Sequence, residues 1–207
     1  MAPPGATRLL LLRHGETTPV RDGVPVPLLE GRSDPELDPV GVEQAQRAAA
    51  RLAGENVAAI YVTPLKRTHQ TAAPLAARLG LEPRVEPGLV EVSLGDWEGG
   101  EFRRRAVAGD PVVVEMLRTQ RWDVIPGAER SEDLARRVRE AVARLHAAHP
   151  DQTVLAVSHG GTIGELLAQA SGARPLAFGA DNGSVSEVVV AGDVWTVRRF
   201  NDTAHLR

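Results

Sequence analysis

The chain has 207 residues, of which 43% are hydrophobic and 25% charged, with a formal net charge of −3 at pH 7. We assign residues 1–207 to one globular domain, because this composition excludes a disordered or fibrous chain and the length is short for two full domains. The missing basic excess argues against nucleic acid as a partner, and the absence of cysteine excludes disulfides, thiolate catalysis and Cys-ligated zinc.

The first half of the chain alternates predicted strands and helices. Residues 8–13 (RLLLLR) form an apolar run that ends at Gly15, which favours a buried strand. Residues 17–39 are rich in Pro, Gly and Asp and predict a loop. The segments that follow predict a helix (39–53), a strand (57–62) and a helix (65–79). Pro74 predicts a kink or break in the second of these helices.

The second half continues the alternation after an ambiguous middle. Residues 83–90 predict an extended segment, whereas residues 99–125 mix arginine and valine runs without a clear pattern. Ser131 is the predicted N-cap of a long helix that ends near His149. A strand (153–158), a helix (162–170) and a hairpin (184–190 and 194–200) complete the chain. The fold class is therefore α/β, a three-layer α/β/α sandwich with a mostly parallel central sheet and antiparallel edge strands.

Histidine and glycine follow two of the predicted strands, in Arg13-His14-Gly15 and in Ser158-His159-Gly160. Ligands of open α/β sheets bind outside the carboxyl ends of the strands, so both histidines are expected on the same rim. Arg67 falls in the first turn of a helix at that rim, where the helix dipole disfavours a cation. Each residue alone could be an ordinary loop or surface residue, but an anionic ligand at this rim accounts for all of them.

With these residues the sequence resembles the histidine phosphatase superfamily, also called the phosphoglycerate mutase-like or RHG family. The resemblance is carried by ordered motifs from residue 8 to about residue 170: Arg13-His14-Gly15-Glu16-Thr17, then Gly31-Arg32-Ser33-Asp34 through Leu37, Gly41 with Gln44-Ala45, Thr63-Pro64 with Arg67 and Thr71-Ala72, Glu91 with Gly95-Asp96-Trp97-Glu98-Gly99, Gly127-Ala128-Glu129, and Ser158-His159-Gly160. The RHG motif alone is short and weak, whereas the ordered series is specific.

The resemblance implies a role for each matching residue. His14 is implied as the nucleophile that becomes a phosphohistidine, with Arg13, Arg67 and His159 around the phosphoryl oxygens. Glu91 is implied as the general acid and then the general base. The substrate-binding residues implied in addition are Gly15, Thr17, Arg32 and Gly160. Guanidinium groups can neutralise phosphoryl oxygens without a metal, so we expect neither a metal nor another cofactor.

Two departures from the family pattern fall in the loop after the first motif. The family motif commonly ends in Asn at the position that Val20 occupies here, so a usual phosphate-contacting amide is missing. Pro19, Pro25 and Pro27 stiffen the same loop. These changes bear on the choice of substrate more than on the reaction.

The resulting hypothesis is a metal-independent phosphomonoesterase that acts on a small phosphorylated metabolite. One alternative is a cofactor-dependent phosphoglycerate mutase, although such mutases resemble longer chains with extra loops. A second alternative is a phospho-ligand-binding module without turnover, which the intact His14, Glu91 and His159 disfavour. The chain has no apolar run of membrane-spanning length, and residues 1–7 are too short and polar for the apolar region of a secretory leader, so we expect no membrane partner and a cytoplasmic location. A homodimer is left open.

Overall fold

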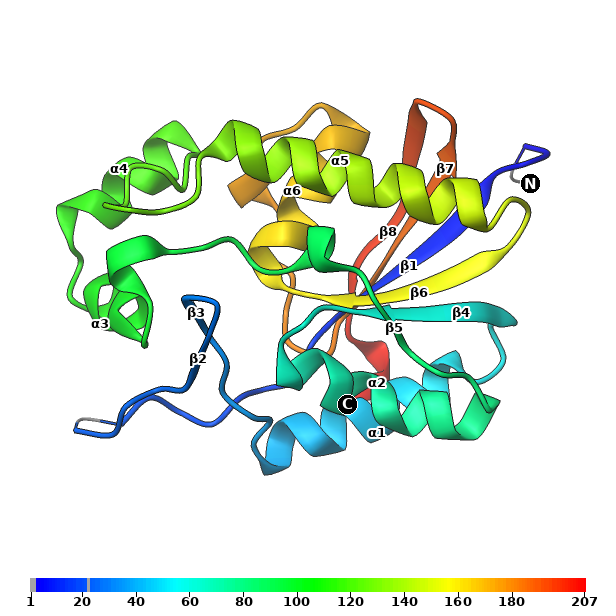
Figure 1. The fold of residues 1–207 in the computed structure, drawn as a ribbon, viewed down its shortest axis with the longest axis horizontal. Coiled ribbons are helices and arrows are strands. Elements are labelled where there is room, and N and C mark those ends of the chain that lie inside the picture. The colour runs from blue at the N-terminus through cyan, green and yellow to red at the C-terminus, as the bar shows by residue number, and fades with distance from the viewer. Residues whose placement is uncertain (1–2, 22) are drawn as a thin grey trace.

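The computed structural model of the protein describes residues 3–21 and 23–207. A six-stranded sheet with strand order β5-β4-β6-β1-β7-β8 runs through its centre (Figure 1). The four parallel strands are β1 (Thr7–Arg13), β4 (Val57–Val62), β5 (Arg84–Val85) and β6 (Thr153–Ser158). The antiparallel strands β7 (Val185–Ala191) and β8 (Val194–Asp202) form the other edge. The predicted mostly parallel sheet with antiparallel edge strands is confirmed.

Helices cover both faces of this sheet, as predicted. The helices α1 (Pro39–Leu52) and α2 (Lys66–Leu79) lie on one face, and α5 (Ser131–Ala148) and α6 (Gly160–Ser171) lie on the other (Figure 1). Side chains of β1 alternate between the two faces because the strand has a period of two. Leu10 and Leu12 join the core with α1 and α2, whereas Leu9 and Leu11 join the core with α5 and α6.

A third, smaller group of elements lies beyond the carboxyl ends of β1, β4 and β6. It contains β2 (Leu28–Leu29), β3 (Arg32–Ser33), α3 (Glu101–Val107) and α4 (Pro111–Thr119) (Figure 1). The two helices occupy the stretch that gave no clear prediction. They pack on a separate apolar cluster of Trp97, Met116 and Ile125, and the Asp110 carboxylate caps α4 by accepting from the Val112 N–H at 2.8 Å.

Two local predictions were wrong, and a third was wrong in part. In the predicted extended segment 83–90, only Arg84–Val85 pairs as a strand, and a 3₁₀ turn over Pro87–Leu89 follows. Pro74 lies inside α2 and does not break it, so of the predicted kink or break the break is wrong and the kink stays a prediction. Arg130, not Ser131, is the N-cap of α5, and its side chain makes no capping bond. The side chain of Asp123 provides the hydrogen bonds at this helix start: its carboxylate accepts from the Ser131 N–H at 3.3 Å and from Ser131 Oγ at 3.2 Å.

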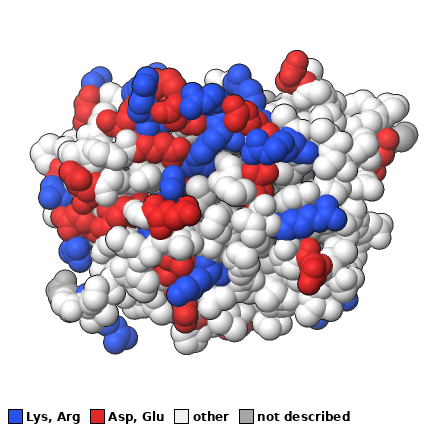
Figure 2. Space-filling model, viewed as in Figure 1, with Lys and Arg blue, Asp and Glu red and all other residues white. Residues whose placement is uncertain are grey.

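The surface in Figure 2 carries acidic and basic side chains interspersed over α5 and the elements beside it. Ion pairs such as Arg136–Asp133 and Arg121–Glu132 join them at 2.7 Å and 2.9 Å. Among the helices of the described residues, none has both the length and the apolarity that a membrane span requires.

Candidate active site

The carboxyl ends of β1 and β6 bring His14 and His159 side by side. These strands pair in parallel with Arg13 opposite Ser158, so the residues that follow them are neighbours. The two imidazole centroids lie 5.2 Å apart, and the residues are only 6% and 0% exposed. The prediction that both histidines lie on one rim of the sheet is therefore confirmed.

The surroundings of His14 fix both its tautomer and its charge. Its Nδ1 lies 2.8 Å from the Gly15 carbonyl oxygen. A carbonyl oxygen can only accept, so Nδ1 carries the proton and Nε2 keeps the lone pair. Burial, followed by the positive charges of Arg67 and Arg13, holds the pKa of His14 well below its ordinary value of 6.5. The imidazole is therefore neutral at pH 7, which is the form that can act as a nucleophile.

Gly15 and Asn182 hold the backbone of the nucleophile in place. A Cβ on Gly15 would lie 2.5 Å from the Gly41 carbonyl oxygen, so only glycine allows this approach of the strand end to α1. The Gly15 N–H already donates to Thr71 Oγ1 at 3.1 Å, which gives Gly15 a packing role. Asn182 Nδ2 donates to the carbonyl oxygens of His14 at 2.9 Å and Gly15 at 3.2 Å. Sequence reasoning missed Asn182, because it precedes β7, far along the chain, and belongs to no recognised motif.

Two guanidinium groups flank the histidines. Arg13 Nη1 donates to the Ala180 carbonyl at 2.6 Å, and Arg67 Nη1 donates to the Ser33 carbonyl at 2.7 Å. Burial lowers the pKa of both arginines from its ordinary value, while the nearby Glu91 carboxylate opposes the change. Arginine keeps its charge at neutral pH, so the two side chains place buried positive charge beside His14.

His159 is oriented by the end of the neighbouring strand β4. Its Nε2 lies 2.9 Å from Thr63 Oγ1. Burial, then Arg67 and His14, holds the pKa of His159 well below 6.5. Within the described residues, His159 Nδ1 and Arg13 Nε are buried polar atoms that have no hydrogen-bond partner. Such atoms are costly unless something satisfies them, and a bound anion could accept from Arg13 Nε, and from His159 Nδ1 in the tautomer that protonates this nitrogen.

Glu91 lies at the first turn of α6. Its carboxylate accepts from the N–H groups of Gly161 at 3.2 Å and Thr162 at 3.1 Å. Its backbone carbonyl accepts from Arg32 Nε at 2.9 Å, and Arg32 Nη2 is 3.7 Å from Glu129. Arg32 therefore positions the segment that carries Glu91.

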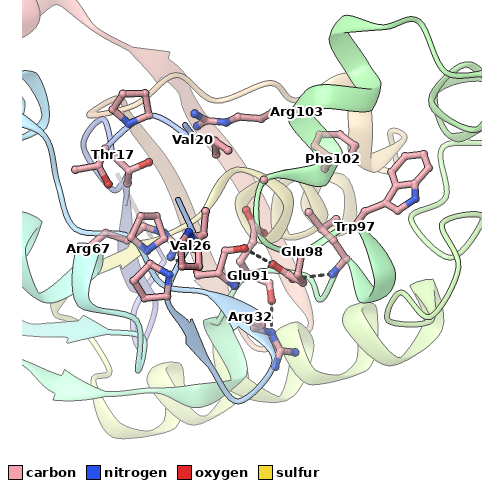
Figure 3. A pocket seen from close by; sticks show the side chains of 18 of the residues that line it. Thr17, Val20, Val26, Arg32, Arg67, Glu91, Trp97, Glu98, Phe102 and Arg103 are labelled. Atoms are coloured by element: carbon pink, nitrogen blue, oxygen red, sulfur yellow. Dashed lines mark hydrogen bonds between the residues drawn. The ribbon is translucent and has the colours of Figure 1, made fainter. Parts of the chain in front are cut away.

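A cavity of about 540 Å³ opens over these groups (Figure 3). Six of the predicted site residues line it: Arg13, His14, Thr17, Arg32, Arg67 and Glu91. Gly160 instead lines an adjoining cavity of about 310 Å³, which shares Arg13 and Glu91 with the first. His159 and Gly15 are not among the lining residues of either cavity. Within residues 3–21 and 23–207, no group of three or more His, Asp or Glu side chains could hold a metal ion.

Comparison with known proteins adds sequence and structural relatives. The family model described as histidine phosphatase superfamily (branch 1) matches residues 9–203. A metal-independent phosphoserine phosphatase of Arabidopsis thaliana is 31% identical over 206 residues, covering 97% of this chain and 83% of that protein. A glucosyl-3-phosphoglycerate phosphatase of Mycobacterium tuberculosis is 34% identical over 172 residues, covering 79% and 74%. The crystal structure of a phosphoserine phosphatase mutant of Entamoeba histolytica in complex with phosphoserine superposes with a TM-score of 0.79 at 25% identity, covering 97% of this chain and 100% of the other.

Proposed function

Because the chain belongs to branch 1 of the histidine phosphatase superfamily and is a phosphomonoester hydrolase, we propose that it acts on small phosphorylated metabolites through a phosphohistidine on His14, without a metal ion. The observation that carries the proposal is the state of His14. Its Nδ1 is bonded to the Gly15 carbonyl, its imidazole is neutral, and it lines the same cavity as Arg13, Arg67 and Glu91.

The first half of the proposed reaction forms the phosphohistidine. The Nε2 lone pair of His14 attacks phosphorus, and the bond between phosphorus and the ester oxygen breaks. Glu91 gives its proton to the departing alkoxide. Arg13 and Arg67 neutralise the equatorial oxygens, which is the main contribution a protein makes to phosphoryl transfer.

The second half regenerates the enzyme. The Glu91 carboxylate takes a proton from a water molecule, whose oxygen attacks phosphorus. The phosphorus–nitrogen bond breaks and its electron pair returns to Nε2 of His14. Because His14 is held neutral, it leaves as the same tautomer that began the cycle.

Phosphate release from a panel of phosphorylated metabolites tests this function. Activity should survive EDTA, because the buried guanidinium groups supply the positive charge that a metal would otherwise provide. His14→Ala should lose at least ~1000-fold in rate, since covalent and positional contributions disappear together. His69→Ala is the matched control, because His69 is exposed on α2 and should leave the rate unchanged.

Two outcomes would contradict the proposal. One is loss of activity on chelation that a divalent ion restores. The other is interconversion of 2- and 3-phosphoglycerate in preference to phosphate release, which would indicate a mutase.

A further inference from the structure

Above Arg13, His14 and Arg67, two walls of mainly apolar side chains bound the larger cavity. The loop wall consists of Val20, Val24, Pro25, Val26 and Pro27, and the helix wall consists of Leu94, Trp97 and Phe102. Figure 3 shows Val26 and Arg67 on one side of the cavity, Trp97 and Phe102 on the other, and Glu91 and Glu98 between them. The cavity therefore has two chemically different parts: a polar floor formed by Arg13, His14 and Arg67, and the apolar walls above it.

Val20 of the loop wall packs on Gly100, which lies in the chain between Trp97 and Phe102 of the helix wall, so the cavity exists before any substrate binds. A Cβ on Gly100 would lie 2.5 Å and 2.6 Å from the two Cγ atoms of Val20, which places the Val20 side chain against the Gly100 backbone. Trp97 is only 3% exposed, and its ring lies 6.3 Å from that of Phe102. A preformed apolar site binds an apolar group without the cost of ordering its own side chains.

The carboxylates of this cavity are already engaged. Glu98 accepts from the Ser33 N–H at 2.9 Å, from Ser33 Oγ at 2.6 Å and from the Leu94 N–H at 2.9 Å. Glu91, the other carboxylate among the described lining residues, is bonded to the first turn of α6. Glu98 is therefore held by Ser33 and Leu94, and Glu91 is the residue assigned to the leaving oxygen, so the described lining offers no further carboxylate for an ammonium group on the substrate.

Positive charge, by contrast, is available near the mouth of the cavity. In the run of three arginines on α3, Arg104 and Arg105 pair with Glu101 at 2.9 Å and 2.7 Å. Arg103 lines the cavity and lies beside Val20 in Figure 3. A cationic substrate would be repelled here, whereas a planar ring could stack on the Arg103 guanidinium.

Resting on the proposed phosphatase function, we propose that this site selects phosphomonoesters whose alcohol portion is bulky, mainly apolar and free of positive charge. The phosphoryl group occupies the floor beside His14, and the alcohol portion lies between the loop wall and the helix wall. The volume of about 540 Å³ falls within the range of sites that hold ligands larger than a three-carbon acid.

2-Phenylethyl phosphate and ethyl phosphate test the proposal, because their leaving groups have similar pKa values and their chemical steps are therefore matched. We expect kcat/KM for 2-phenylethyl phosphate to exceed that for ethyl phosphate by at least about 10-fold, since the ring is taken out of water. It should exceed that for O-phosphoserine and for 2-aminoethyl phosphate by about 100-fold. Equal or better use of ethyl phosphate or of either amino compound would overturn the proposal.

Variants of the loop wall test where the selectivity resides. Val20→Ser and Val26→Ser should each narrow the ratio of kcat/KM between 2-phenylethyl and ethyl phosphate by about 5-fold, because each removes apolar contact from the wall. Val107→Ser is the matched control, since Val107 lies on α3 and is 90% exposed, and it should keep the wild-type ratio. An unchanged ratio in both wall variants would overturn the assignment of the walls.

A binding measurement separates this proposal from the proposed function. Calorimetry with 3-phenylpropylphosphonate and propylphosphonate, which cannot be hydrolysed, should show at least about 10-fold tighter binding of the phenyl compound. If the protein shows this binding preference but hydrolyses none of the phosphomonoesters, the phosphatase mechanism is refuted and the selectivity is not. Turnover without any such preference, in binding or in kcat/KM, would refute the selectivity alone.

Discussion

At the scale of single residues, the proposed division of labour between His14 and Glu91 can be tested by changing the leaving group. An alkoxide needs a proton as it departs, whereas p-nitrophenolate does not. Glu91→Gln should therefore slow formation of the phosphohistidine from an alkyl phosphate by ~100-fold or more, and from p-nitrophenyl phosphate much less.

The measurement must be the pre-steady-state burst, because Glu91 also acts as base in the second half of the reaction. Equal losses for the two substrates in the burst would show that Glu91 is not the acid. Glu16 and Glu98 would then be the next residues to change. Glu98 is the less suitable of the two, since its carboxylate is fixed by Ser33 and Leu94.

At the scale of elements, the start of α6 positions Glu91, and a single methyl group can disturb it. A Cβ on Gly161 would lie 2.8 Å from Glu91 Oε1 and 3.1 Å from Val92 Cγ1. Gly161→Ala should push the Glu91 carboxylate aside and lower kcat/KM for alkyl phosphates by ~10-fold or more. Stability should hardly fall, because alanine favours the helix by about 1 kcal/mol over glycine.

The control for this variant is Gly54→Ala, where a Cβ would meet no atom within 4 Å. Thermal unfolding and steady-state kinetics of both variants separate the two effects. An active but destabilised Gly161→Ala protein would mean that the start of α6 serves packing rather than the placement of Glu91.

The sequence predicts best those elements that are specified locally. The apolar run of β1 and the histidine after it could be recognised, because continuous burial and the strand end leave a pattern within a few residues. The contact of Asn182 with the His14 backbone could not be predicted, because the two residues are far apart in the chain. The contact of Asp123 with Ser131 was also missed, because Asp123 lies in the loop before α5 and only the folded loop turns its carboxylate toward the helix start. The apolar walls also escaped prediction, since loop residues such as Val26 form a cavity only once α3 packs opposite them.

At the scale of the whole molecule, the two buried histidines of the site should make stability depend on pH. Folding lowers the pKa of His14 and of His159 below 6.5, so the folded protein binds fewer protons than the unfolded chain. The free energy of unfolding therefore falls as pH drops below 6.5, by roughly 1 kcal/mol per pH unit for each histidine. The fall ends once the pH is below the folded-state pKa values.

Urea unfolding at pH 7.5 and pH 5.5, compared between wild type and His14→Gln, measures this effect. The variant should lose less stability than wild type over the interval, because one of the two groups no longer titrates. The same pH dependence in both proteins would show that His14 does not carry a lowered pKa.

The central claim is that the imidazole of His14 carries the phosphoryl group. Glu91→Gln should accumulate this intermediate with p-nitrophenyl phosphate, because the leaving group departs unaided while attack by water is slowed. Peptide mass spectrometry after a quench in base is the most direct measurement. The account predicts one phosphoryl group on His14, stable in base and lost in acid. A phosphoryl group on any other residue, or turnover of the variant without one on His14, would contradict it.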